Sequence, residues 1–405
     1  MYTNTNSRSV FRSSRRPGGG RSTYHGGGRR PSRKGEGQII NPDRFIRPAT
    51  VVSEQPVFQP THQFVDFALN DLLKTNLQRR GYVTPTPIQD QAIPAGLNGQ
   101  DVVGVANTGT GKTAAFALPI LHRLMNEQQG RALIIAPTRE LAEQIFEEFR
   151  VFGRGSGLHG CLIIGGTSMP AQIRELKFRP RVIIGTPGRL KDHIQRGTLN
   201  LKDAHHVVLD EVDRMVDMGF IDDIRFLLGQ LPEIRQSYFF SATIDPKLKS
   251  LVNSFLRDPV SISVKTGETS DNVSQDVIRY SASGDKLAKL QTALTQASGQ
   301  KTLIFDQTQR GVERLSHTLI EHGFKADAIH GGKNQSQRSR ALNKFKKNEI
   351  DVLVATDVAA RGIDVADITH VINYSVPKTY DDYIHRIGRA GRAGRAGQAL
   401  TFVVH

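Results

Sequence analysis

The chain has 405 residues, of which 38% are hydrophobic, so it is long enough for two globular domains and a terminal extension. Its net charge of +15 indicates a polyanionic partner. Cys161 is the single cysteine, which excludes an intramolecular disulfide and thiolate metal clusters and fits a reducing compartment. No run approaches the roughly 18 apolar residues of a membrane span, and the N-terminus lacks the apolar stretch of a secretory signal. We therefore expect a cytoplasmic protein without membrane association.

Residues 1–38 form a basic, glycine-rich segment. They contain nine basic residues and one acidic residue, which is about half of the net charge of +15. Such a composition buries too little apolar area to offset chain entropy, so we expect residues 1–60 to be a disordered basic Arg/Gly-rich tail. Arginine side chains contact phosphates, and glycine makes the chain flexible enough to reach them. This composition favours a segment that tethers RNA without sequence specificity. A solubilising tail is the alternative.

Short apolar runs separated by helical periodicity follow the tail. Because the strands of a parallel sheet are buried on both faces, this pattern predicts two α/β domains. The expected strands are 102–105, 132–136, 182–185, 207–209 and 238–240, then 302–305, 352–355 and 371–374. Gly, Thr, Ser and Asp interrupt both patterns at residues 265–274. The sequence therefore predicts a linker there, between domains at 61–264 and 275–405.

A candidate phosphate loop follows the first expected strand. It reads Ala106, Asn107, Thr108, Gly109, Thr110, Gly111, Lys112, Thr113. Its glycines let backbone N–H groups approach phosphate oxygens, Lys112 reaches the β and γ phosphates, and the Thr113 hydroxyl ligates Mg²⁺. Ala106 stands where the general pattern has a glycine, and a glycine-rich turn that binds nothing is the alternative. Because a strand precedes the loop and a helix follows it, we expect nucleotide binding.

An acidic run, Asp210-Glu211-Val212-Asp213, follows the strand expected at 207–209. Its carboxylates repel one another without a cation, and Mg²⁺ held largely through waters is that cation. Asp210 is then the acid beside the metal, and Glu211 is the base that orients or deprotonates the attacking water. An acidic surface turn is the alternative.

Three arginines recur at a spacing of three residues in the second domain, at Arg386, Arg389 and Arg392. On a helix they would share one face, where guanidinium groups repel unless an anion lies among them. A nucleotide triphosphate is that anion if the active site is split between two domains, so that hydrolysis needs closure. A solvated basic face is the alternative.

Taken in order, these motifs resemble those of the DEAD-box RNA helicases of superfamily 2, over about residues 64–405. The resemblance implies two RecA-like domains with parallel sheets, ATP as the nucleotide and RNA as the partner. Gly81–Gln89 is similar to the adenine-sensing Q motif of the family, with Phe64 as its upstream aromatic residue. The Gln89 amide donates to and accepts from an adenine edge at once, which guanine would not match. Val212 replaces the family's Ala, and Ala390 replaces its usual Thr.

The resemblance also implies the roles of the remaining motif residues. Expected RNA contacts are Pro137, Thr138, Arg139, Gly165, Gly166, Thr186, Gly188, Arg189, Gln335, Arg338, Thr356 and Asp357. Expected coupling residues between the domains are Asp213, Ser241, Thr243, His385 and Arg386. Expected nucleotide contacts are Phe64, Gln89, residues 106–113 and the ribose ligand Asp364, while Arg389 and Arg392 are the arginine fingers beside Lys112, Asp210 and Glu211.

The sequence thus predicts an RNA-stimulated ATPase that closes on ATP and single-stranded RNA, bends the strand and releases or remodels a short duplex. Because the family contacts sugar-phosphate and 2′-hydroxyl groups, we expect weak sequence preference, with ribonucleoprotein partners and a monomeric state. An ATP-gated RNA clamp that rarely unwinds is one alternative, and a DNA helicase is another. Strand displacement compared with ATP hydrolysis separates the first, and RNA compared with DNA as stimulator separates the second.

Overall fold

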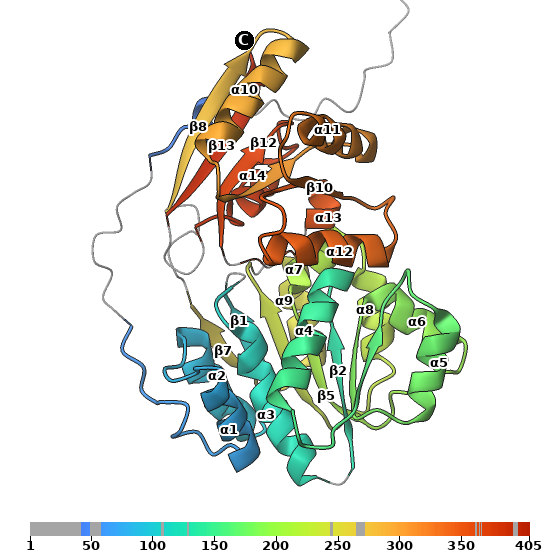
Figure 1. The fold of residues 1–405 in the computed structure, drawn as a ribbon. Helices are drawn as coiled ribbons and strands as arrows, with labels where there is room; N and C mark the ends of the chain where they lie inside the picture. The colour runs from blue at the N-terminus through green and yellow to red at the C-terminus, as the bar shows by residue number, and fades with distance from the viewer. Residues whose placement is uncertain are drawn as a thin grey trace, which may run out of the picture. The chain divides into compact units, whose positions relative to one another are not determined.

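The structure is a computed structural model that describes residues 42–48, 58–106, 109–127, 129–243, 246–264, 272–360, 363, 365, 367–391 and 396–405 (Figure 1). Within these residues the chain forms two α/β units, each built on a parallel sheet. The expected tail up to residue 41 and most of the expected linker lie outside the described residues. No helix in the described part of the chain is long and apolar enough to cross a membrane.

The first domain contains a seven-stranded parallel sheet with the order β3-β4-β2-β5-β6-β1-β7. Its strands are β1 (Val102–Val105), β2 (Arg131–Ile135), β3 (Gly160–Ile163), β4 (Val182–Gly185), β5 (Ala204–Leu209), β6 (Gln236–Ser241) and β7 (Val260–Ser263). Its helices are α1 (Asp71–Arg79), α2 (Pro87–Leu97), α3 (Lys112–Asn126), α4 (Arg139–Phe152), α5 (Met169–Lys177), α6 (Pro187–Gln195), α7 (Val212–Asp217), α8 (Ile221–Leu228) and α9 (Pro246–Phe255).

The second domain contains a six-stranded parallel sheet with the order β10-β11-β9-β12-β13-β8. Its strands are β8 (Val273–Tyr280), β9 (Lys301–Phe305), β10 (Ala326–Ile329), β11 (Val352–Ala355), β12 (Ile368–Asn373) and β13 (Gly397–Val404). Its helices are α10 (Ser283–Gln296), α11 (Gln309–Glu321), α12 (Gln335–Lys346), α13 (Asp357–Ala360) and α14 (Tyr380–Ile387).

Side chains alternate between two cores along each central strand. In β2, Ala132 and Ile134 belong to one hydrophobic cluster, whereas Leu133 and Ile135 belong to the cluster on the opposite face of the sheet. Both faces are therefore shielded by helices, which is why the central strands read as unbroken apolar runs. The eight strands expected from those runs are all present, within a few residues of their expected ends.

Five strands lie outside these eight runs, namely β3, β7, β8, β10 and β13. All of them except β13, which lies between β12 and β8, are edge strands of the two sheets as described. An edge strand is only partly covered, so polar residues are tolerated, as in β8, whose exposed positions include Asp276 and Arg279. Continuous apolar runs therefore identify the centre of a parallel sheet but miss its margins.

One short element lies inside the range that was expected to be disordered. The 3₁₀ helix η1 (Pro42–Phe45) lies beside β8 (Figure 1), and the Phe45 ring is fully buried in a core of the second domain. The expectation of disorder up to residue 60 is therefore wrong for residues 42–48, because an aromatic side chain here finds a hydrophobic site.

Candidate nucleotide and RNA site

The phosphate loop runs from β1 into α3. Gly111 is the N-cap of α3 with a φ of 90°, and a Cβ there would lie 2.3 Å from Nε2 of Gln89, so glycine is required. Lys112 begins the helix and is buried, with its Nζ donating to the carbonyl of Ala106 over 3.0 Å. The backbone thus turns its amides toward the helix start, where a phosphate would bind. Asn107 and Thr108 lie outside the described residues.

The Gln89 amide connects α2 to this loop. Its Oε1 accepts from the Thr86 amide over 2.9 Å, and its Nε2 donates to the Gly111 carbonyl over 3.0 Å. The Thr86 hydroxyl also donates to the Thr110 carbonyl over 2.8 Å. Because an amide group carries two N–H bonds and two lone pairs, one of each is left for an adenine edge. The Q motif is therefore attached directly to the phosphate loop.

Phe64 lies behind the site rather than in it. Its ring is buried and packs edge-on against Tyr82, with 5.4 Å between ring centroids. Tyr82 lines a cavity of about 310 Å³ together with Gly111, Lys112 and Thr113, and Phe64 is absent from the described lining. Phe64 therefore supports Tyr82, and Tyr82 is the residue of this pair that lines the cavity.

The acidic run follows β5, directly beside the loop. Burial raises the pKa of Asp210 to about 6, although Lys112, whose Nζ lies 3.8 Å from Oδ1, favours the charged form. Glu211 has a φ of 53°, which is strained for a residue with a side chain and typical of functional sites. Its Oε2 accepts from Nη1 of Arg214 over 2.7 Å, and both side chains are buried.

Arg214 was missed in the sequence analysis. Its position three residues after Glu211, at the start of a short helix, was the signal that could have identified it. Val212 is fully buried in a hydrophobic cluster, so the larger side chain is accommodated by packing at this position.

Asp213 joins the acidic run to the end of β6. Its Oδ2 accepts from the amides of Ala242 and Thr243 over 2.9 and 3.0 Å and from the Thr243 hydroxyl over 3.3 Å. The Asp213 amide donates to the Ser241 hydroxyl over 3.4 Å. The structure therefore brings together the three expected coupling residues of the first domain.

The first-domain residues expected to contact RNA lie at helix starts. Thr138, which follows Pro137, is the N-cap of α4, and its hydroxyl accepts from the Leu141 amide over 3.3 Å. Thr186 is the N-cap of α6, and a Cβ on Gly188 in the first turn would meet open space within the described structure. Both helix starts thus carry backbone N–H groups suited to phosphate.

Three arginines gather near these helix starts. The Arg139 guanidinium lies against Gly165 and Gly166, because a Cβ on Gly166 would approach Nη1 to 2.2 Å. The pKa of Arg139 is lowered, first by burial and then by the positive charges of Arg338 and Arg189. Mutual repulsion of this kind is relieved when an anion binds.

Arg189 is held from behind by a buried network. Its Nη1 donates to Oε1 of Gln172 over 3.1 Å, and the same oxygen lies 2.9 Å from Nε2 of the fully buried His193. Burial lowers the pKa of His193, so the ring is neutral. Since Gln172 Oε1 can only accept, Nε2 carries the proton, and Nδ1 lies 2.9 Å from the Thr198 hydroxyl, which donates to the His193 carbonyl over 2.9 Å. Neither Gln172 nor His193 was expected from sequence.

In the second domain, Gln335 and Arg338 are buried on α12. Arg338 Nη2 lies 2.7 Å from Oε1 of Glu140, and Gln335 Nε2 donates to Oε1 of Glu143 over 2.9 Å. Burial raises the pKa of Glu140, while Arg338 opposes that shift. Both glutamates were overlooked, although Glu140 directly follows the expected RNA contact Arg139.

Asp357 forms a bidentate ion pair with Arg386, with distances of 2.5 Å to Nε and 2.8 Å to Nη2. Arg386 also donates to the Asn373 side chain over 3.1 Å, and its guanidinium lies over the Phe305 ring at 5.1 Å. Thr356 is buried immediately before Asp357. The structure therefore places Asp357 against an arginine that was expected to act in coupling.

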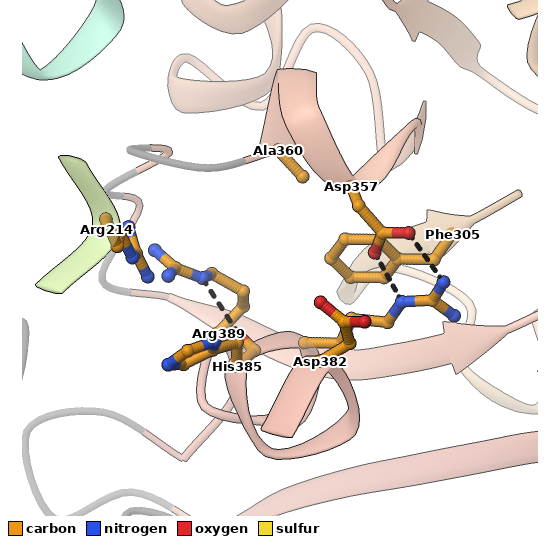
Figure 2. A pocket seen from close by; sticks show the side chains of 8 residues that line it. Arg214, Phe305, Asp357, Ala360, Asp382, His385 and Arg389 are labelled. Atoms are coloured by element: carbon orange, nitrogen blue, oxygen red, sulfur yellow. Dashed lines mark hydrogen bonds and ion pairs between the residues drawn. The ribbon is translucent and has the colours of Figure 1, made fainter. Parts of the chain in front are cut away.

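The arginine run does not continue a helix. Because α14 ends at Ile387, with Gly388 as its C-cap, the expectation that the three arginines share a helix face is wrong. Arg389 is buried beyond the helix end, where Nε donates to the His385 carbonyl over 3.3 Å and Nη1 donates to the Ile363 carbonyl over 3.0 Å. Figure 2 shows Arg389 and His385 beside Arg214 in one cavity.

Three further residues of the second domain were singled out in the sequence, namely Ala390, Arg392 and Asp364. Ala390 is fully buried in a hydrophobic cluster, where the Thr hydroxyl usual in the family would need a polar partner. Arg392 and the expected ribose ligand Asp364 lie outside the described residues.

Both domains of the chain match family models. Residues 86–251 match the family model for DEAD/DEAH box helicases, and residues 285–394 match the helicase conserved C-terminal domain. The chain is 44% identical to the ATP-dependent RNA helicase CshA of Limosilactobacillus reuteri over 84% of this chain and 69% of that protein. It is 42% identical to CshA of Listeria monocytogenes over 84% of this chain and 66% of that protein.

Two solved structures are similar to both domains. Saccharomyces cerevisiae Dbp5 bound to RNA and ADP BeF3 is 29% identical, with a TM-score of 0.75 over 84% of this chain and 89% of that one. Mss116p bound to ssRNA and AMP-PNP is 30% identical, with a TM-score of 0.75 over 83% of this chain and 73% of that one.

Proposed function

Because this chain belongs to the DEAD-box family of ATP-dependent RNA helicases, with two RecA-like domains, we propose that the cavity beside Lys112 binds ATP for RNA-stimulated hydrolysis. The observation that carries the proposal is the 3.8 Å approach of Lys112 Nζ to buried Asp210, with Gln89 hydrogen-bonded to the same loop. The cavity therefore offers a cation for phosphates and a carboxylate for a metal, and Gln89, bonded to Gly111 of its lining, supplies an amide for adenine.

Magnesium suits the donor groups of this cavity. Asp210 is a buried carboxylate whose charge is disfavoured by burial, and Thr113 offers a hydroxyl nearby in the same lining. No cluster of three His, Cys, Asp or Glu side chains that could hold a metal occurs in the described residues. Mg²⁺ commonly uses one or two protein oxygens, with waters and phosphates completing its ligands. Asp210 and Thr113 would hold it, and it would neutralise phosphate charge.

The protein groups then divide the chemistry. Glu211 orients or deprotonates the attacking water, and Arg214 holds its carboxylate at 2.7 Å. Arg389, with Arg392, supplies positive charge to the transferring phosphoryl group, while Lys112 holds the nucleotide before closure. The bonds from Arg389 to two carbonyls hold its guanidinium in one orientation, which lowers the cost of ordering it during the reaction.

RNA is proposed to bind along the helix starts of α4 and α6 and beside α12. Arg139 and Arg189 supply charge, and the N-terminal backbone amides of the helices meet phosphate and sugar. Arg338 Nε has no hydrogen-bond partner within the described residues, so a donor remains there despite the pair with Glu140. Since these groups contact the backbone of a strand, sequence preference is expected to be weak.

The proposed cellular location is the cytoplasm, and the proposed oligomeric state is a monomer. A cytoplasmic location is supported by the single cysteine, Cys161, which is a buried free thiol. A monomer that remodels short RNA duplexes and ribonucleoproteins fits the weak sequence preference, because such a protein would act on many RNAs.

ATP hydrolysis measured with and without single-stranded RNA tests the proposed function. We expect RNA to stimulate turnover and single-stranded DNA to stimulate it much less. At the same ATP concentration, we expect the two strands of a short RNA duplex to be separated. Equal stimulation by DNA would indicate a DNA helicase. Stimulated hydrolysis without displacement would indicate an RNA clamp.

A further inference from the structure

The segment Arg44–Arg47 is built into the second domain, although it precedes the first domain in sequence. Phe45 is fully buried, and its ring lies 4.6 Å from that of Tyr383 between centroids. Arg44 places its guanidinium 4.2 Å from the centre of the Tyr380 ring. Both tyrosines belong to α14, so this helix is covered by two consecutive residues of the segment.

The same segment extends the sheet at its edge. The Arg47 amide donates to the Gln275 carbonyl over 2.9 Å, and the Gln275 amide donates to the Arg47 carbonyl over 2.8 Å, in an antiparallel bridge to β8. The Gln275 side chain is buried and accepts from the Tyr383 hydroxyl over 2.9 Å. Backbone groups of an edge strand are thereby paired, and β8, Tyr383 and Phe45 form one connected unit.

Helix α14 connects this unit to Arg389. The helix that carries Tyr380 and Tyr383 continues to His385 and ends at Ile387, and the His385 carbonyl accepts from Nε of Arg389. A rotation of α14 would therefore move the carbonyl to which Arg389 is bonded. Two contacts of α14 oppose such a rotation. One is the packing of Phe45 on Tyr383, and the other is the ion pair of Arg386 with Asp357.

We propose that Phe45 is a positioning residue for Arg389, which acts by fixing α14 on the second domain. This inference rests on the proposed role of Arg389 in hydrolysis. The segment lies outside residues 86–251 and 285–394, the ranges that match the family models. A small displacement of a catalytic group is sufficient to slow a reaction strongly.

Phe45→Ala in the full chain tests the proposal, with Ile46→Ala as the matched control because the Ile46 side chain is 49% exposed beside it. We expect RNA-stimulated turnover of Phe45→Ala to fall roughly tenfold or more. The KM for ATP should stay unchanged, since Gln89 and Lys112 belong to the first domain. Ile46→Ala should match the wild type. Equal turnover of the two variants would overturn the proposal.

A double variant separates positioning from general damage. If Phe45 acts through the finger, adding Phe45→Ala to Arg389→Ala should cause no further loss of turnover, whereas multiplied losses would overturn the proposal. Phe45→Leu, which fills the site without the ring, replaces the alanine variant if the latter does not fold, with a smaller loss in the same direction.

Hydrogen exchange of the Gln275 amide gives a measurement that is independent of catalysis. Exchange should be faster in Phe45→Ala than in Ile46→Ala, and equal exchange would overturn the proposal. A wild-type chain without RNA-stimulated turnover would refute the proposed function, whereas the exchange result would still report whether Phe45 holds the segment on β8.

Discussion

Nη1 of Arg189 donates to Oε1 of Gln172 over 3.1 Å, so an arginine expected to contact RNA is fixed by a buried amide. The amide is in turn fixed, because its Nε2 donates to the Ile164 carbonyl over 2.9 Å and its Oε1 faces His193. Arg189 therefore loses less conformational entropy when a phosphate binds than a solvated arginine would.

His193→Ala should weaken binding of single-stranded RNA about two- to tenfold, the amount typical of one net hydrogen bond. The reason is that Gln172 loses a donor and no longer holds Arg189 in one orientation. Hydrolysis without RNA should be unchanged. Equilibrium titration of RNA measures the effect, with His205→Ala as the control because His205 is exposed. Equal RNA affinities for the two variants would show that Arg189 needs no such support.

Glu211→Gln should retain ATP and RNA binding but slow hydrolysis by roughly 10²–10⁴-fold, because an amide cannot take a proton from water. The amide oxygen can still accept from Arg214, so the local structure should persist. Single-turnover hydrolysis with RNA measures the change. Glu147→Gln is the control, because Glu147 lines the same cavity. A rate within about threefold of wild type would contradict the role of Glu211 as the base.

Gln89→Ala should reduce discrimination between ATP and GTP, because the free donor and acceptor of this amide are proposed to read adenine. The variant also loses the bond to the Gly111 carbonyl, so affinity for both nucleotides should fall somewhat. Competition between ATP and GTP measures the ratio of affinities. Gln91→Ala, on the exposed side of the same helix, should leave the ratio unchanged. An unchanged ratio in Gln89→Ala would assign adenine recognition to another group.

Arg389→Ala should lower turnover by about 10³–10⁵-fold, as expected of an arginine finger, with nucleotide affinity preserved. The affinity should persist because Lys112 and Gln89 hold the nucleotide in the first domain. Turnover and ATP binding are measured separately, and Arg310→Ala, which removes an exposed arginine, is the control. Normal turnover in Arg389→Ala would mean that the arginine run is structural.

Removal of residues 1–38 should weaken RNA affinity and reduce its salt dependence by about 0.7 in slope for each lost phosphate contact. Maximal RNA-stimulated turnover should stay nearly unchanged, since this deletion leaves η1 and Phe45 in place. RNA titrations at several salt concentrations provide the measurement. Identical slopes for the full and shortened chains would support a solubilising tail.

The sequence by itself was sufficient to predict the central strands and the motifs at their ends. Burial on both faces demands unbroken apolar runs such as Leu133–Ile135, and the carboxyl ends of parallel strands collect the polar residues that follow them. The contact of Lys112 with Asp210, and those of Asp213 with the end of β6, accordingly lie where the order of motifs placed them. Such features depend on neighbours in sequence and on the regular geometry of one sheet.

Only the tertiary structure decided the features that depend on distant partners. Edge strands such as β8 carry a mixed pattern because one side is uncovered, and Phe45 becomes ordered because a site next to Tyr383 receives it. The helix ends at Ile387, so Arg389 lies beyond it and is bonded to the Ile363 carbonyl. His193 is linked to Arg189 through its hydrogen bond with Gln172. A local pattern records how a residue is buried but not which groups, far along the chain, complete its hydrogen bonds and its packing.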